Sequence, residues 1–154
     1  MTLVINASPL IFLSKVDRLF LLRDCFEVTL TPPAVVAEIG TVRLPAFIQI
    51  TPLSEIGSAF VRGALGSLHA GELEVMVLAR DLGIGLVGLD DLLARRKAQQ
   101  MGLQPIGTIG LILLAHERGV LTAADAWSSV EELVRLHGLY LSPRILESVR
   151  AALQ

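Results

Sequence analysis

Polar side chains stand directly after two apolar runs of the chain. Asn6 follows residues 3–5, and the pair Asp90-Asp91 follows residues 85–89. Carboxylate and amide oxygens are the ligands that hard ions such as Mg²⁺ and Mn²⁺ take. Such ions orient a water molecule and neutralise the charge that builds on a phosphodiester during displacement. These residues therefore indicate metal-assisted chemistry, provided that the fold brings the two runs side by side.

Two glutamates belong to the same hypothesis. Glu38 lies at the end of a predicted helix, and Glu72 opens the helix that leads into residues 85–89. Each has a simpler explanation, because an exposed glutamate is usually a solvated charge and a first-turn glutamate is favoured by the helix dipole. One aspartate is enough to cap the helix after residue 91, so we expect Asp90 to be the cap and Asp91 the metal ligand.

Strands and helices alternate along the chain. Short apolar runs predict strands at residues 3–5, 27–30, 47–50, 85–89 and 102–106. Helical periodicity and capping signals predict helices at residues 10–22, 33–39, 69–82, 92–101, 108–118, 123–137 and 142–153, with a weaker one at 54–65. Ser8, followed by Pro9, is the expected cap of the first helix, which we expect to bend near Val16 and Asp17. Asn6 has the same capping preference, so capping and function are equally good explanations of it.

This alternation predicts an α/β fold, a three-layer α/β/α sandwich with a short parallel sheet and helices on both faces. The 154 residues suit one domain spanning residues 1–154. Ligands of such sheets bind beyond the carboxyl ends of the strands, where the strand order reverses. If the first and fourth strands are neighbours across that point, Asn6 and the two aspartates converge.

The composition limits the environment and the partners. The chain is 53% hydrophobic and 18% charged, but no window offers the roughly 20 apolar residues of a membrane span. The lone Cys25, which we expect in the core, fits a reducing compartment, so we expect a cytoplasmic protein. A net charge of −2 gives no general attraction for nucleic acid, which must come from a local patch. Arg95 on the helix after Asp91 is one candidate for contacting RNA phosphates, although a solvated helix face is the better explanation of it.

Five segments together resemble the PIN domain, specifically its VapC-like, DUF3368 branch. They are residues 4–11 (VINASPLI), 33–39 (PAVVAEI), 70–74 (AGELE), 89–96 (LDDLLARR) and 107–110 (GTIG). They span nearly the whole chain in order. The resemblance implies a PIN-like fold and an endoribonuclease that depends on Mg²⁺ or Mn²⁺. Such a protein is often the toxin of a toxin–antitoxin pair and usually a homodimer.

The resemblance also implies the roles of particular residues. The acidic pocket of the family corresponds to Asn6, Glu38, Glu72 and Asp91, with Asp90 as a neighbour that assists or substitutes. Small hydroxyl positions near the pocket, where substrate contact is expected, correspond to Ser8 and Thr108. The first strand of the family commonly ends in Asp, whereas this chain has Asn6. An asparagine offers one carbonyl oxygen but brings no charge and cannot act as a base, so we expect weaker ion binding.

The leading hypothesis is a metal-dependent RNA endonuclease, with an antitoxin protein as a partner. The alternative is a PIN-like module that has lost catalysis and acts by binding protein or RNA, which Asn6 and the negative net charge favour. An α/β phosphatase with an aspartate nucleophile needs two aspartates flanking one residue after the first strand. Asn6-Ala7-Ser8 does not supply them, which excludes that mechanism.

Overall fold

The computed structural model describes residues 1–64 and 68–154. The strands of this part of the chain are β1 (Thr2–Ile5), β2 (Val28–Thr31), β3 (Ile48–Ile50), β4 (Leu86–Gly88) and β5 (Gln104–Ile106). They form a parallel sheet in the order β3-β2-β1-β4-β5. The chain leaves β1 toward β2 and later returns to the other side of β1 as β4. The strand order therefore reverses between β1 and β4, as the sequence hypothesis required.

Helices connect and follow the strands of the sheet. Those in the described residues are α1 (Ala7–Lys15), α2 (Phe20–Cys25), α3 (Pro33–Glu38), α4 (Glu55–Ala64), α5 (Ala70–Asp81), α6 (Leu92–Gln100), α7 (Thr108–Glu117), α8 (Ala123–Leu136) and α9 (Pro143–Ala152). The bend predicted in the first helix is confirmed as a break between α1 and α2, where Asp17 has a φ of 55°. The last residue of the helix predicted over 54–65 lies outside the described residues.

The start of α1 differs from the prediction. The helix begins at Ala7, and Asn6 holds the N-cap position without a side-chain capping bond. Ser8, predicted as the cap, lies within the first turn, and its hydroxyl donates to Asp90 instead. The Ser-Pro pair was a misleading signal, because a serine in the first turn can serve a residue distant in sequence. Capping therefore does not explain Asn6.

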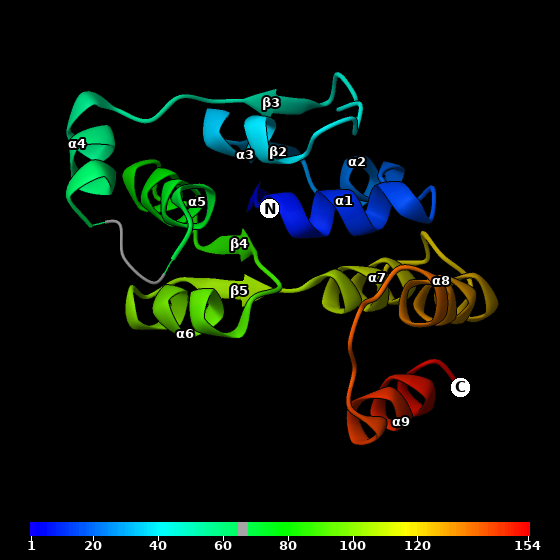
Figure 1. Cartoon of the computed structure of the whole chain (residues 1–154). Coiled ribbons are helices and arrows are strands. Elements are labelled where there is room, and N and C mark those ends of the chain that lie inside the picture. The colour runs from blue at the N-terminus through cyan, green and yellow to red at the C-terminus, as the bar shows by residue number, and fades with distance from the viewer. Residues whose placement is uncertain (65–67) are drawn as a thin grey trace.

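The sheet lies between two helical layers, which confirms the predicted α/β/α sandwich. Helix α2 packs on β2, α5 packs on β1 and β4, and α6 packs on β5, while α3 packs on both α1 and α5. Helix α7 packs on α1 and α2, and α8 packs on α7. Figure 1 shows α7, α8 and α9 gathered at the end of the molecule away from α4 and α5.

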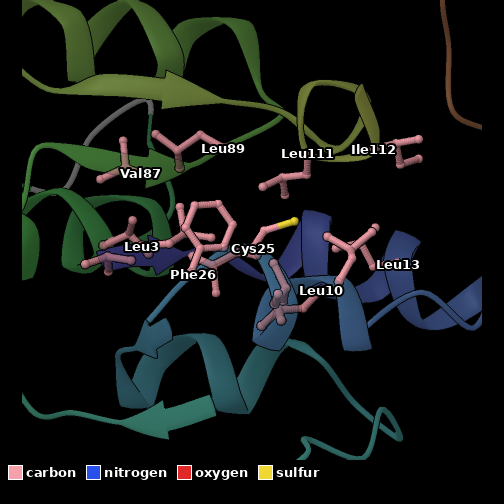
Figure 2. Close-up of a cluster of buried hydrophobic side chains, with 14 of the residues drawn as sticks. Leu3, Leu10, Leu13, Cys25, Phe26, Val87, Leu89, Leu111 and Ile112 are labelled. Atoms are coloured by element: carbon pink, nitrogen blue, oxygen red, sulfur yellow. The ribbon is translucent and has the colours of Figure 1, made fainter. Parts of the chain in front are cut away.

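The core fills the space between the sheet and these helices. Figure 2 shows side chains of β1, α1, α2 and α7 turned toward one another, among them Leu3, Leu10 and Leu111. All three have 0% of their surface exposed. Cys25, at 3% exposure, is part of the same cluster, which confirms its predicted place in the core. This packing fixes α1 and α7 against the sheet, and both helices begin at the edge where the polar residues gather.

Candidate active site at the carboxyl edge of the sheet

The carboxyl ends of β1 and β4 lie side by side, as predicted. Ile5 pairs with Gly88 in the parallel ladder, and the Asn6 backbone N–H donates to the Gly88 carbonyl at 3.0 Å. Gly88 permits this approach, because a Cβ there would lie 2.8 Å from Ile5 Cγ1. The residues that follow the two strands, Asn6 and Asp90, therefore share one edge of the sheet at the switch point.

Asp90 ties three elements of this edge together. Its Oδ2 accepts hydrogen bonds from Ser8 Oγ at 2.8 Å and from Thr108 Oγ1 at 2.7 Å, and its Oδ1 accepts one from the Thr108 N–H at 2.7 Å. Thr108 has 0% of its surface exposed. The two hydroxyls predicted to contact substrate are thus donors to Asp90 in this structure. Arg95, the third such residue, lies beside Gly107, with Nη1 3.3 Å from where a Cβ of that glycine would stand.

Asp91 is the N-cap of α6. Its Oδ1 accepts a hydrogen bond from the Ala94 N–H at 2.9 Å. The expectation that Asp90 would be the cap is therefore wrong. Helix α6 begins at Leu92, so the residue directly before it has the side chain that reaches the free N–H groups of the first turn. The capping bond uses one oxygen of the exposed Asp91 carboxylate and leaves the other for a ligand.

The start of α5 brings two glutamates together. Glu72 Oε2 accepts a hydrogen bond from the His69 N–H at 3.1 Å, and Glu38 Oε1 accepts one from the Gly71 N–H at 3.1 Å. Burial raises the pKa of the Glu72 carboxyl above its ordinary value, the His69 hydrogen bond opposes that rise, and the charges of Asp91 and Glu38 add to it. The charges of Asp91 and Glu38 thus both act on the Glu72 carboxyl.

A cavity of about 360 Å³ opens at this edge and is lined by Asn6, Glu38 and Glu72, among others. Asn6 is only 6% exposed, and its Oδ1 accepts no hydrogen bond from any described residue. A buried acceptor without a donor costs about 1–3 kcal/mol, so such an atom calls for a ligand or a water molecule. Asn6 thus has a buried oxygen without a donor and lines the same cavity as two carboxylates.

These oxygens fit a small divalent cation that keeps part of its water shell. No three His, Cys, Asp or Glu side chains in residues 1–64 and 68–154 are grouped so that they could hold an ion by themselves. The donor set instead needs the Asn6 amide oxygen together with the second oxygens of Glu38 and Glu72. Mg²⁺ is commonly held in this way, by one or two carboxylates and several waters.

The cavity has further residues to which the sequence hypothesis gave no role. Phe12 and Lys15 line it from α1, and His69 and His137 line it from the start of α5 and the end of α8. The helical spacing of Phe12 and Lys15 from Ser8 is a signal that could have identified them. His137 gave no such signal, because the turn after α8 brings it to the cavity only through tertiary packing. Its Nε2 lies 3.4 Å from a carboxylate oxygen of Glu132.

The comparison with protein families identifies the class to which this parallel α/β sandwich belongs. The family model DUF3368, described as a PIN domain, matches residues 2–154. The chain therefore belongs to this family of PIN domains, which are generally nucleases. No curated protein and no solved structure matched the chain. No helix in the described part of the chain is both long and apolar enough to span a bilayer.

Proposed function

We propose that this protein is a metal-dependent endoribonuclease of the PIN type. The observation that carries the proposal is Asn6, whose Oδ1 is buried without a donor and which lines the same cavity as Glu38 and Glu72. Most buried polar side-chain atoms have a hydrogen-bond partner, so this one calls for a ligand or a water molecule. A nucleophilic water and a divalent cation are the groups that such a set of oxygens suits.

The proposed roles follow from the position of each side chain. Asn6, Glu38 and Glu72 would hold Mg²⁺ or Mn²⁺, with the second oxygen of Asp91 directed to the ion or to its waters. The ion, when bound, supplies an activated water and neutralises charge on the phosphodiester. Burial raises the pKa of the Glu72 carboxyl, and a bound cation would favour the charged form that acts as a ligand. Asp90 holds α1, β4 and α7 in the arrangement that keeps these groups together.

The biological setting is part of the same proposal. A toxin of a toxin–antitoxin pair needs surface for an antitoxin protein, and a homodimer needs surface for a second copy. Large apolar side chains are exposed on α4, where Ile56 is 85% and Phe60 57% exposed, and Tyr140 after α8 is 83% exposed. Such exposed apolar residues are consistent with protein contacts of either kind.

The second candidate function is a PIN-like module without catalysis. Two features favour it: Asn6 brings no charge, and the carboxylates of the described residues do not by themselves form a metal-binding group. The module would act through RNA or protein binding at the same edge of the sheet. The two candidates differ in whether the cavity binds a divalent ion and cleaves RNA.

The test is a calorimetric titration of Mn²⁺ into metal-free protein, followed by an RNA cleavage assay with Mn²⁺ or Mg²⁺. The variants are Asp91→Ala and Glu72→Ala, and Glu147→Ala on the exposed side of α9 is the matched control. We expect native protein and the control to bind the ion and cleave, and both site variants to remain folded without cleaving. Cleavage that persists in both site variants would refute the proposal.

The variant Asn6→Asp separates the two candidate functions. If native protein is inert and this variant binds Mn²⁺ and cleaves, the pocket is that of an enzyme weakened by the loss of one charge. If both are inert and neither binds the ion, the non-catalytic module is the correct function.

A further inference from the structure

One face of α1 lines the candidate site without any assigned role. Ser8, Ile11, Phe12 and Lys15 all line the cavity, and they are spaced at i, i+3, i+4 and i+7. This spacing places the four side chains along one stripe of the helix. The Ser8 hydroxyl already donates to Asp90, so the remaining surface of the stripe is an aliphatic side chain, an aromatic ring and an ammonium group.

The charge of Lys15 is available to a ligand. The residue is exposed in the last turn of α1, and no carboxylate oxygen in the described part of the chain comes within 4 Å of its ammonium group. Glu38 and Glu72 also line the cavity, and the whole chain has a net charge of −2. A polyanion that reaches those carboxylates needs a cation beside them, and Lys15 stands in that position.

The ring of Phe12 completes a site for an unpaired base. Phe12 packs partly against the core, which holds the ring in place, and as a partly buried residue that lines the cavity it keeps some accessible surface. Aromatic rings next to cationic groups are how single-stranded nucleic acids are bound, with the base stacked on the ring and the phosphate near the cation. Phe12 and Lys15 are about 4.5 Å apart along the helix axis, close enough to serve one nucleotide.

We propose that this face of α1 binds an unpaired nucleotide of RNA, with its base stacked on Phe12 and its phosphate paired with Lys15. The inference rests on the proposed function in placing RNA in this cavity. It goes further in naming two residues of this chain, Phe12 and Lys15, that would hold one nucleotide of that RNA. A base within a duplex is stacked on its neighbours and cannot reach the ring, so double-stranded RNA should bind weakly.

The test measures binding without cleavage. Fluorescence anisotropy in EDTA, which prevents metal-dependent cleavage, would follow a labelled single-stranded RNA of about ten nucleotides, within the range of site sizes of single-strand binders. The variants are Lys15→Met and Phe12→Leu, with Lys15→Arg and Phe12→Tyr as conservative replacements. Matched controls away from the cavity are Lys97→Met on α6 and Phe60→Leu on α4. Circular dichroism and thermal unfolding would establish that each variant is folded.

We expect Phe12→Leu to weaken binding by about five-fold or more, the lower end for loss of stacking on one base. Lys15→Met should weaken it and lower the slope of log K against log salt by about 0.7, the value for one phosphate contact on a single strand. Lys15→Arg and Phe12→Tyr should bind RNA about as tightly as native protein does, and so should the two controls.

Three results would overturn the inference: equal affinity of native protein and both variants, equal affinity for a duplex of the same length, or no RNA binding at all. Failure of the proposed function looks different. If RNA binds through Phe12 and Lys15 but is not cleaved in Mn²⁺ or Mg²⁺, the nucleotide site stands and the endoribonuclease is refuted. If RNA is cleaved and both variants bind RNA as native protein does, the endoribonuclease stands and the nucleotide site is refuted.

Discussion

Two adjacent aspartates should differ several-fold in their effect on stability. Asp90 accepts three hydrogen bonds, from Ser8 and from two atoms of Thr108, whereas Asp91 accepts one capping bond. Hydrogen bonds to charged groups contribute about 1.5–3 kcal/mol each, and because Asp90 is half-buried we take about 1–1.5 kcal/mol for each of its three. Asp90→Ala also leaves the fully buried Thr108 without acceptors. The expected loss is about 3–4 kcal/mol, against about 1 kcal/mol for Asp91→Ala.

Urea unfolding of metal-free protein measures this difference directly. With a slope of about 2 kcal/mol per molar urea, the midpoint should fall by about 1.5–2 M in Asp90→Ala and by about 0.5 M in Asp91→Ala. Thr108→Val, which keeps the shape and the N–H donor but removes the hydroxyl, should fall in between. A midpoint for Asp91→Ala as low as that for Asp90→Ala would refute the assignment of Asp90 as the structural anchor of the site.

Two further predictions concern the glutamates. Because the pKa of Glu72 is raised in the folded state, folding favours its protonated form. The stability that protonated Glu72 contributes is fully present below the ordinary carboxyl pKa of 4.5 and is lost as the pH rises through the raised pKa of the folded state. Urea midpoints measured in EDTA should therefore decline over that pH window in native protein and stay flatter in Glu72→Gln. Gly71→Ala places a Cβ against the Glu38 carboxylate, which is exposed and can move aside. We expect it to change stability by less than about 1 kcal/mol but to weaken Mn²⁺ binding in calorimetry, and unchanged binding would exclude Glu38 from the ion site.

The sequence predicted the sheet edge better than the contacts made there. Apolar runs located all the strands described here, and the position of Asn6 and the aspartates directly after two of those runs indicated where they would meet. The local signals at helix starts were less reliable. Ser8 had every feature of a cap, but its hydroxyl serves Asp90, 82 positions away. A cap is decided by sequence neighbours, whereas this bond depends on how α1 is placed against β4.

The same limit explains which cavity residues went unnoticed. Phe12 and Lys15 share a face of α1 with Ser8, so helical periodicity predicts that the three lie together. No local signal showed that this face would line a cavity. His137 reaches the cavity only because α8 packs on α7 and its end returns toward the site. A residue that reaches the site through helix packing has no local sequence signal for that position. His137 is also far in sequence from the other histidines, so no metal-ligand spacing identified it.

Asn6 is the residue that best tests whether this site is catalytic. Its replacement by aspartate should have opposite effects on the stability of the fold with and without metal. Asn6→Asp would place a third carboxylate beside Glu38 and Glu72 in a cavity where burial already raises the pKa of Glu72. Without an ion, this repulsion and the desolvation of the new charge should destabilise the fold by about 1–3 kcal/mol. With Mn²⁺ the same charge becomes a ligand, and binding stabilises the fold by RT ln(1 + [L]/Kd), which gives about 2.7 kcal/mol at one hundred times Kd. Thermal unfolding should therefore show a lower Tm than native protein in EDTA and a larger upward shift in Mn²⁺. If the variant is instead more stable than native protein in EDTA, or shifts less in Mn²⁺, the Asn6 side chain does not face the ion and the cavity is not the metal site.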